Sequence, residues 1–69
     1  MRVSARNVLK GKIVRLEPGA VNTVVTMELA GGTQIVAVIT KAAAQDLGLT
    51  VGREAYAVIK ASSVIVGVD

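Results

Sequence analysis

The chain has 69 residues, which is enough for one small domain. Eight Lys and Arg residues against five acidic ones give a net charge of +3, and apolar residues make up 52% although Tyr56 is the only aromatic one. Because Cys and His are absent, disulfide scaffolds, zinc fingers, thiol nucleophiles and Ser-His-Asp triads are excluded. No apolar run approaches the roughly 18 residues of a membrane span, and no signal peptide is recognisable, so we expect a cytoplasmic protein without membrane contact.

The small size also bears on assembly. A chain this short buries only a limited fraction of its surface when alone, and it has no disulfide or zinc cluster to add stability. Association with further copies of the chain is the remaining way to bury enough apolar surface. We therefore expect an obligate homo-oligomer.

The first part of the chain predicts two strands joined by a turn. Residues 8–16 alternate imperfectly between polar and apolar side chains. Residues 17–20, Glu-Pro-Gly-Ala, are typical of a turn. Residues 22–29 alternate regularly, so one face of this second strand carries Val25, Met27 and Leu29.

A third strand and a helix follow. Two consecutive glycines at positions 31–32 predict a hairpin turn, and residues 34–39 are apolar on both faces, as in a strand that is buried on both sides. Thr40 is a favourable N-cap for a short helix over residues 41–47. Gly48 stands where a helix ends in the left-handed conformation.

Two further strands are predicted over residues 54–60 and 63–68. The expected fold class is therefore all-β. The order of elements is typical of a five-stranded OB-like barrel with one short helix between strands 3 and 4, spanning residues 1–69 as a single domain.

The acidic residues do not suggest a catalytic or cation site. They fall in a turn, on a strand, on the helix, at a strand start and at the terminus, namely Glu17, Glu28, Asp46, Glu54 and Asp69. No spacing forces two of them together, so neither a carboxylate pair nor a metal-cation site is indicated. We expect no enzyme activity and no cofactor.

Cations accompany small hydroxyl residues at three places in the chain. The groups are Ser4 with Arg6, Thr40 with Lys41, and Lys60 with Ser62 and Ser63. Small neighbours such as Ala5, Ala42 and Ala61 let the backbone approach a compact ligand. A tetrahedral oxyanion needs several donors and modest positive charge, which these groups supply.

A basic OB-like domain could instead bind nucleic acid or a protein partner. Single-strand binders of this fold stack bases on aromatic side chains. Tyr56 is the only aromatic residue here, and a charge of +3 is modest for a surface that follows phosphates. This interaction-module alternative stays open, although we do not expect nucleic-acid binding.

Two stretches of the sequence resemble a known family. Residues 4–7, Ser-Ala-Arg-Asn, followed by Leu9 and Gly11, are similar to the opening signature of the Mop domain, the module of the small molbindins. Residues 56–64, Tyr-Ala-Val-Ile-Lys-Ala-Ser-Ser-Val, are similar to its closing signature. The likeness runs from about residue 2 to residue 68.

The resemblance implies a hexamer, arranged as a trimer of dimers, that binds molybdate or tungstate between subunits and serves intracellular storage or buffering. The implied principal site comprises Ser4, Arg6, Lys60, Ala61 and Ser62. Ser4 and Arg6 would come from one chain and the other three residues from a neighbour. The implied further sites comprise Gly19, Ala20, Val21 and Asn22 together with Thr40, Lys41 and Ala42. The metal would be bound as an oxyanion and not as a cation.

Overall fold

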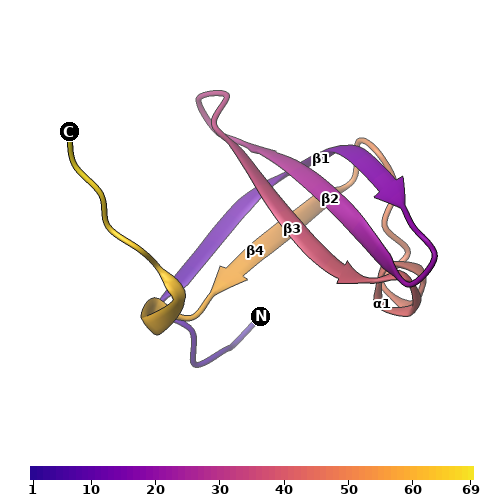
Figure 1. Cartoon of the computed structure of the whole chain (residues 1–69), viewed down its shortest axis with the longest axis horizontal. Coiled ribbons are helices and arrows are strands. Elements are labelled where there is room, and N and C mark those ends of the chain that lie inside the picture. The colour runs from indigo at the N-terminus through magenta and orange to yellow at the C-terminus, as the bar shows by residue number, and fades with distance from the viewer.

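The computed structural model describes residues 1–69 as one antiparallel sheet with a short helix (Figure 1). The elements in chain order are β1 (Asn7–Pro18), β2 (Asn22–Leu29), β3 (Gln34–Thr40), α1 (Lys41–Asp46), β4 (Glu54–Ile59) and the 3-10 turn η1 (Ala61–Ser63). None of the helices has the length and hydropathy that crossing a membrane requires.

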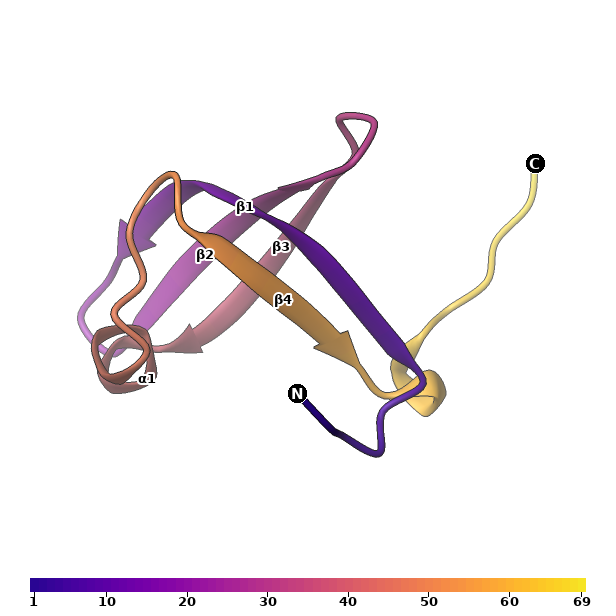
Figure 2. The same cartoon turned by 180° about the vertical axis from the view of Figure 1, so that it is seen from behind.

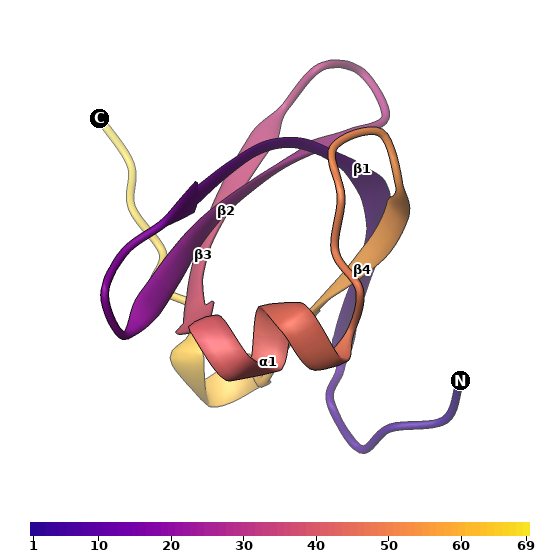
Figure 3. The same cartoon turned by 90° about the vertical axis from the view of Figure 1, so that its right-hand side faces the viewer.

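The sheet forms a half-barrel. Its strands lie in the order β3-β2-β1-β4, and all neighbouring pairs are antiparallel. Figure 3 views the molecule from the end that α1 occupies and shows a curled sheet with α1 lying across that end. The outer strands β3 and β4 each pair on one side only, so the barrel does not close within the chain. The all-β, OB-like class and the helix between the third and fourth strands are confirmed.

The predicted fifth strand over residues 63–68 is wrong for this chain. After β4 the backbone turns through η1, where the Ser63 N–H donates to the Lys60 carbonyl at 2.8 Å. The residues that follow run away from the sheet (Figure 2). A strand exists only where a neighbour supplies hydrogen-bond partners. This segment has side chains that favour a strand, but it has no neighbouring strand and therefore stays unpaired.

The predicted helix is confirmed to within one residue, because α1 ends at Asp46 with Leu47 as its C-cap. Thr40 has the extended backbone of an N-cap, and its side-chain oxygen accepts a hydrogen bond from the Ala43 N–H at 3.0 Å. Gly48 has a φ of +61°, the left-handed conformation that glycine adopts without strain. These two residues fix where the short helix begins and ends.

Replacing Thr40 with alanine removes this cap. We expect Thr40→Ala to lower the free energy of unfolding by about 1 kcal/mol, because one N–H of the first helical turn loses its acceptor. Thr40→Ser keeps the acceptor and is the control, with a stability near that of the parent chain. Urea unfolding followed by circular dichroism measures both. Equal stability of the alanine and serine variants would show that the cap contributes nothing.

The imperfect alternation in β1 has a structural cause. Ile13 is paired with Met27 but Arg15 is paired with Thr26, so Val14 is an extra residue in a β-bulge. The bulge shifts the pattern by one position and places both Ile13 and Leu16 toward the interior. β1 extends through Pro18. The turn therefore begins at Gly19 and not at Glu17 as predicted.

The fully buried core is small. Only four residues are buried, namely Ile13, Thr23, Val25 and Met27. The inward residues of β3, Ile35, Ala37 and Ile39, pack against this cluster and are partly buried. Val36 and Val38 on the other face of β3 are exposed, so the predicted burial of both faces is not found within one chain. An apolar outer face on a strand is typical of a surface that a partner covers.

Candidate functional site

The start of β1 and the end of β4 meet at one end of the sheet. β1 begins at Asn7 and β4 ends at Ile59, and these residues are register partners in the antiparallel pair. The Asn7 side-chain amide also donates a hydrogen bond to the Ile59 carbonyl at 3.3 Å across 52 positions of sequence. The segment before β1 therefore lies beside the segment after β4.

This arrangement forms a hollow of about 460 Å³, which we call the terminal hollow. It is lined by Ser4, Ala5, Arg6, Val58, Lys60, Ala61 and Ser62. The lining thus includes every residue of the implied principal site. Within one chain, the segment that contains Ser4 and Arg6 lies beside the segment that contains Lys60, Ala61 and Ser62.

The terminal hollow has the charge and donors that an anion requires. Two cations, Arg6 and Lys60, line it, and no carboxylate does. Neither cation takes part in the two ion pairs of the chain. The hydroxyls of Ser4 and Ser62 add donors, and charge-assisted hydrogen bonds of this kind are about twice as strong as neutral ones. The arrangement can bind a small anion without first breaking an internal ion pair.

Sequence reasoning did not assign Ala5 or Val58 to the site. Ala5 was noted only as a small neighbour, and it is half-buried between two site residues. Val58 lies two positions before Lys60 at the end of β4. Because alternate residues of a strand share a face, this spacing is the signal that could have placed Val58 beside Lys60.

The residues of the implied further sites, 19–22 and 40–42, lie beside α1. The turn η1, which contributes to the terminal hollow, lies at the opposite end of the molecule (Figure 1). The two segments of the implied further sites do meet, because the Lys41 N–H donates to the Val21 carbonyl at 2.8 Å and Asn22 is paired with Thr40. Of the residues in these two segments, Lys41 alone lines a hollow there, together with residues such as Thr23 and Gln45. The structure therefore keeps the two implied groups apart within one chain.

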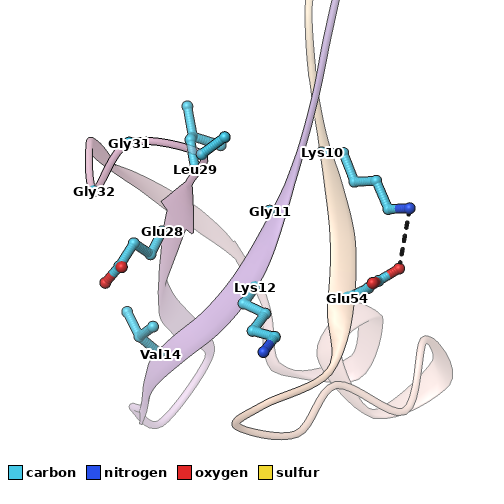
Figure 4. A pocket seen from close by; sticks show the side chains of 10 residues that line it. Lys10, Gly11, Lys12, Val14, Glu28, Leu29, Gly31, Gly32 and Glu54 are labelled. Carbon is cyan, nitrogen blue, oxygen red and sulfur yellow. Dashed lines mark ion pairs between the residues drawn. The ribbon is translucent and has the colours of Figure 1, made fainter.

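A third hollow contains both signs of charge and none of the implied residues. Lys10, Lys12, Glu28 and Glu54 line it beside the Gly31–Gly32 hairpin, and Figure 4 shows the ion pair between Lys10 Nζ and Glu54 Oε2 at 3.2 Å. The hydrogen bond to Glu54, and then its charge, raise the pKa of Lys10 above the ordinary value. Both side chains are mostly exposed, so the pair adds little stability. The balanced charges make this hollow a poor match for an anion.

Comparison with known proteins agrees with the fold. The model of the TOBE domain matches residues 3–66. A probable molybdenum-pterin-binding protein of Haemophilus influenzae is 51% identical over 69 residues, covering 100% of both chains. The solved structure of MopII from Clostridium pasteurianum has a TM-score of 0.93 at 40% identity, covering 97% of this chain and 100% of that one. ModG, described as a cytoplasmic molybdate-binding protein and solved with molybdate bound, has a TM-score of 0.96 at 54% identity, covering 100% of this chain and 49% of ModG.

These relatives are named as binding proteins and not as enzymes. The match to the family model covers most of the chain, and the relative from Haemophilus influenzae aligns over its whole length. The backbone also follows that of two solved relatives closely. The chain therefore belongs to the TOBE-domain family and, within it, to the Mop or molbindin group.

Proposed function

We propose that the protein binds molybdate or tungstate in the terminal hollow. The observation that carries this proposal is a pair of cations, Arg6 and Lys60, that face one hollow with two serine hydroxyls and no carboxylate. A tetrahedral dianion matches this set, because it accepts hydrogen bonds from several directions at once. The similarity to ModG, which was solved with molybdate bound, supports the choice of oxyanion.

The protein acts as a hexamer that stores or buffers the oxyanion in the cytoplasm, with ligands held near subunit boundaries. The exposed valines of β3 support assembly, because such a face is favourable only when it is covered. Each chain has a net charge of +3, so bound dianions reduce the repulsion between assembled chains. The segments 19–22 and 40–42, which meet beside α1, form a further oxyanion site in this proposal.

An interaction module that binds nucleic acid or a protein partner is the alternative function. The structure offers Tyr56 as the single aromatic platform, and no second ring lies beside it for a neighbouring base. The oxyanion function therefore has the greater support. Selectivity for molybdate over sulfate would come from the size of the site, because the two anions have the same charge and shape.

Native mass spectrometry of the purified protein tests the proposal. Samples are measured alone and with molybdate, tungstate or sulfate at equal concentration. We expect a hexamer whose mass increases by whole numbers of molybdate or tungstate ions and not by sulfate. An oligomer that takes up neither metal oxyanion contradicts the proposed function. Binding of an oligonucleotide that molybdate does not displace would favour the alternative.

A further inference from the structure

Only one wall of the terminal hollow has backbone hydrogen bonds of its own. Residues 60–62 lie in or beside η1, where the Ser63 N–H donates to the Lys60 carbonyl at 2.8 Å. The other wall, residues 4–6, belongs to a segment without any backbone hydrogen bond, residues 1–6. The position of this second wall is therefore set by the point at which it joins β1.

Asn7 is that point, and its side chain holds the two walls together. It is the first residue of β1 and the register partner of Ile59, the last residue of β4. Its amide nitrogen Nδ2 donates to the Ile59 carbonyl oxygen at 3.3 Å. Along the chain, Arg6 precedes Asn7 and Lys60 follows Ile59. The hydrogen bond thus joins the two residues that lie directly beside the two cations of the hollow.

The two cations oppose this arrangement when no anion is bound. Arg6 and Lys60 carry like charges, and no carboxylate lines the hollow to offset them. Repulsion between like charges favours moving their segments apart. An anion, by contrast, must find both cations close together. A contact that keeps the two segments together in advance lowers the cost of binding, because the ligand then has less of the site to order.

We propose that Asn7 is a positioning residue that holds residues 4–6 against residues 60–62, so that the terminal hollow is formed before the anion binds. This inference rests on the proposed oxyanion function, because it concerns the same hollow. Asparagine suits the role because its amide donates a hydrogen bond without adding a charge. An ionised aspartate has a similar shape but can only accept, so it would direct a carboxylate oxygen at the Ile59 carbonyl.

Asn7→Leu removes the hydrogen bond with little change in side-chain size. We expect this variant to bind molybdate about three- to ten-fold more weakly, the effect of losing one hydrogen bond. Asn7→Gln keeps an amide donor and should recover part of the loss. The control is Gln34→Leu, which exchanges an amide for the same apolar side chain at the first residue of β3, outside the hollow, and should keep the parent affinity. Isothermal titration calorimetry measures all four chains, and circular dichroism checks their sheet content.

A double-mutant cycle separates positioning from a general loss of structure. If Asn7 acts by placing Arg6, Asn7→Leu should weaken binding less than about two-fold in a chain that already carries Arg6→Ala. The same fold-loss in both backgrounds, or equal affinities of the leucine and glutamine variants, would overturn the positioning role. A parent chain that takes up neither metal oxyanion contradicts the proposed function and this inference with it. A parent chain and an Asn7→Leu variant that bind molybdate equally well overturn the inference alone.

Discussion

Arg6→Ala and Lys60→Ala are each expected to weaken molybdate binding by about ten- to a hundred-fold. Each substitution removes a charge-assisted hydrogen bond, and such bonds contribute about 1.5–3 kcal/mol. Every 1.4 kcal/mol corresponds to about a factor of ten in affinity. Isothermal titration calorimetry with molybdate measures the change. Tungstate affinity should fall in parallel, because both anions present the same oxygen atoms to the two cations.

The fold should survive both substitutions. Arg6 and Lys60 are exposed, neither forms an ion pair, and the Lys60 side chain makes no cap hydrogen bond to η1. The matched control is Lys12→Ala, which also removes one positive charge but lies in the hollow of mixed charge shown in Figure 4. Circular dichroism checks that all three variants keep their sheet. If all three bind molybdate with equal affinity, the terminal hollow is not the binding site.

Local chemistry explains why most of the elements could be predicted. Thr40 and Gly48 delimit α1 through contacts within a few residues of themselves. Gly31 and Gly32 have φ values of +88° and +91°, the conformation that a tight hairpin requires. The regular alternation of β2 shows directly in the burial of Val25 and Met27. In each case the residues that determine the structure are sequence neighbours.

Features that depend on distant partners were harder to predict. The bulge at Val14 is defined only by the pairing of β1 with β2. The segment 63–68 has the composition of a strand, but composition does not say whether its pairing partner lies in the same chain. The prediction of a closed barrel failed at this point because the turn η1 separates the segment from β3 and β4.

The candidate site also combines features that local sequence predicts with one that depends on distant pairing. The sequence identified Ser4 with Arg6 and Lys60 with Ser62 as chemically similar groups near the two ends of the chain. Nothing in their spacing places the two groups together, and only the resemblance to the Mop domain joined them. The structural reason is the pairing of Asn7 with Ile59, which brings both groups to one end of the sheet. Strand register, and not residue type, therefore creates the terminal hollow.

Ile13→Ala is expected to lower the free energy of unfolding by about 2–5 kcal/mol, the usual cost of such a truncation in a core. Ile13 is 1% exposed and is the largest fully buried side chain. It lies beside the bulge of β1 and packs with Val25 and Met27, the other two residues of the buried cluster. Native domains are stable by only about 5–15 kcal/mol, so this one truncation removes a large share of the total.

Urea unfolding measures this loss. All variants are compared at one chain concentration and without added anion, because assembly and ligand binding both raise apparent stability. Ile13→Val should lose only about 0.5–1.5 kcal/mol, since it removes a single methyl group. Val51→Ala truncates an exposed valine and should change stability little. If Ile13→Ala and Val51→Ala unfold at the same urea concentration, the three-residue cluster is not the main source of stability. The contacts between copies would then hold the fold together.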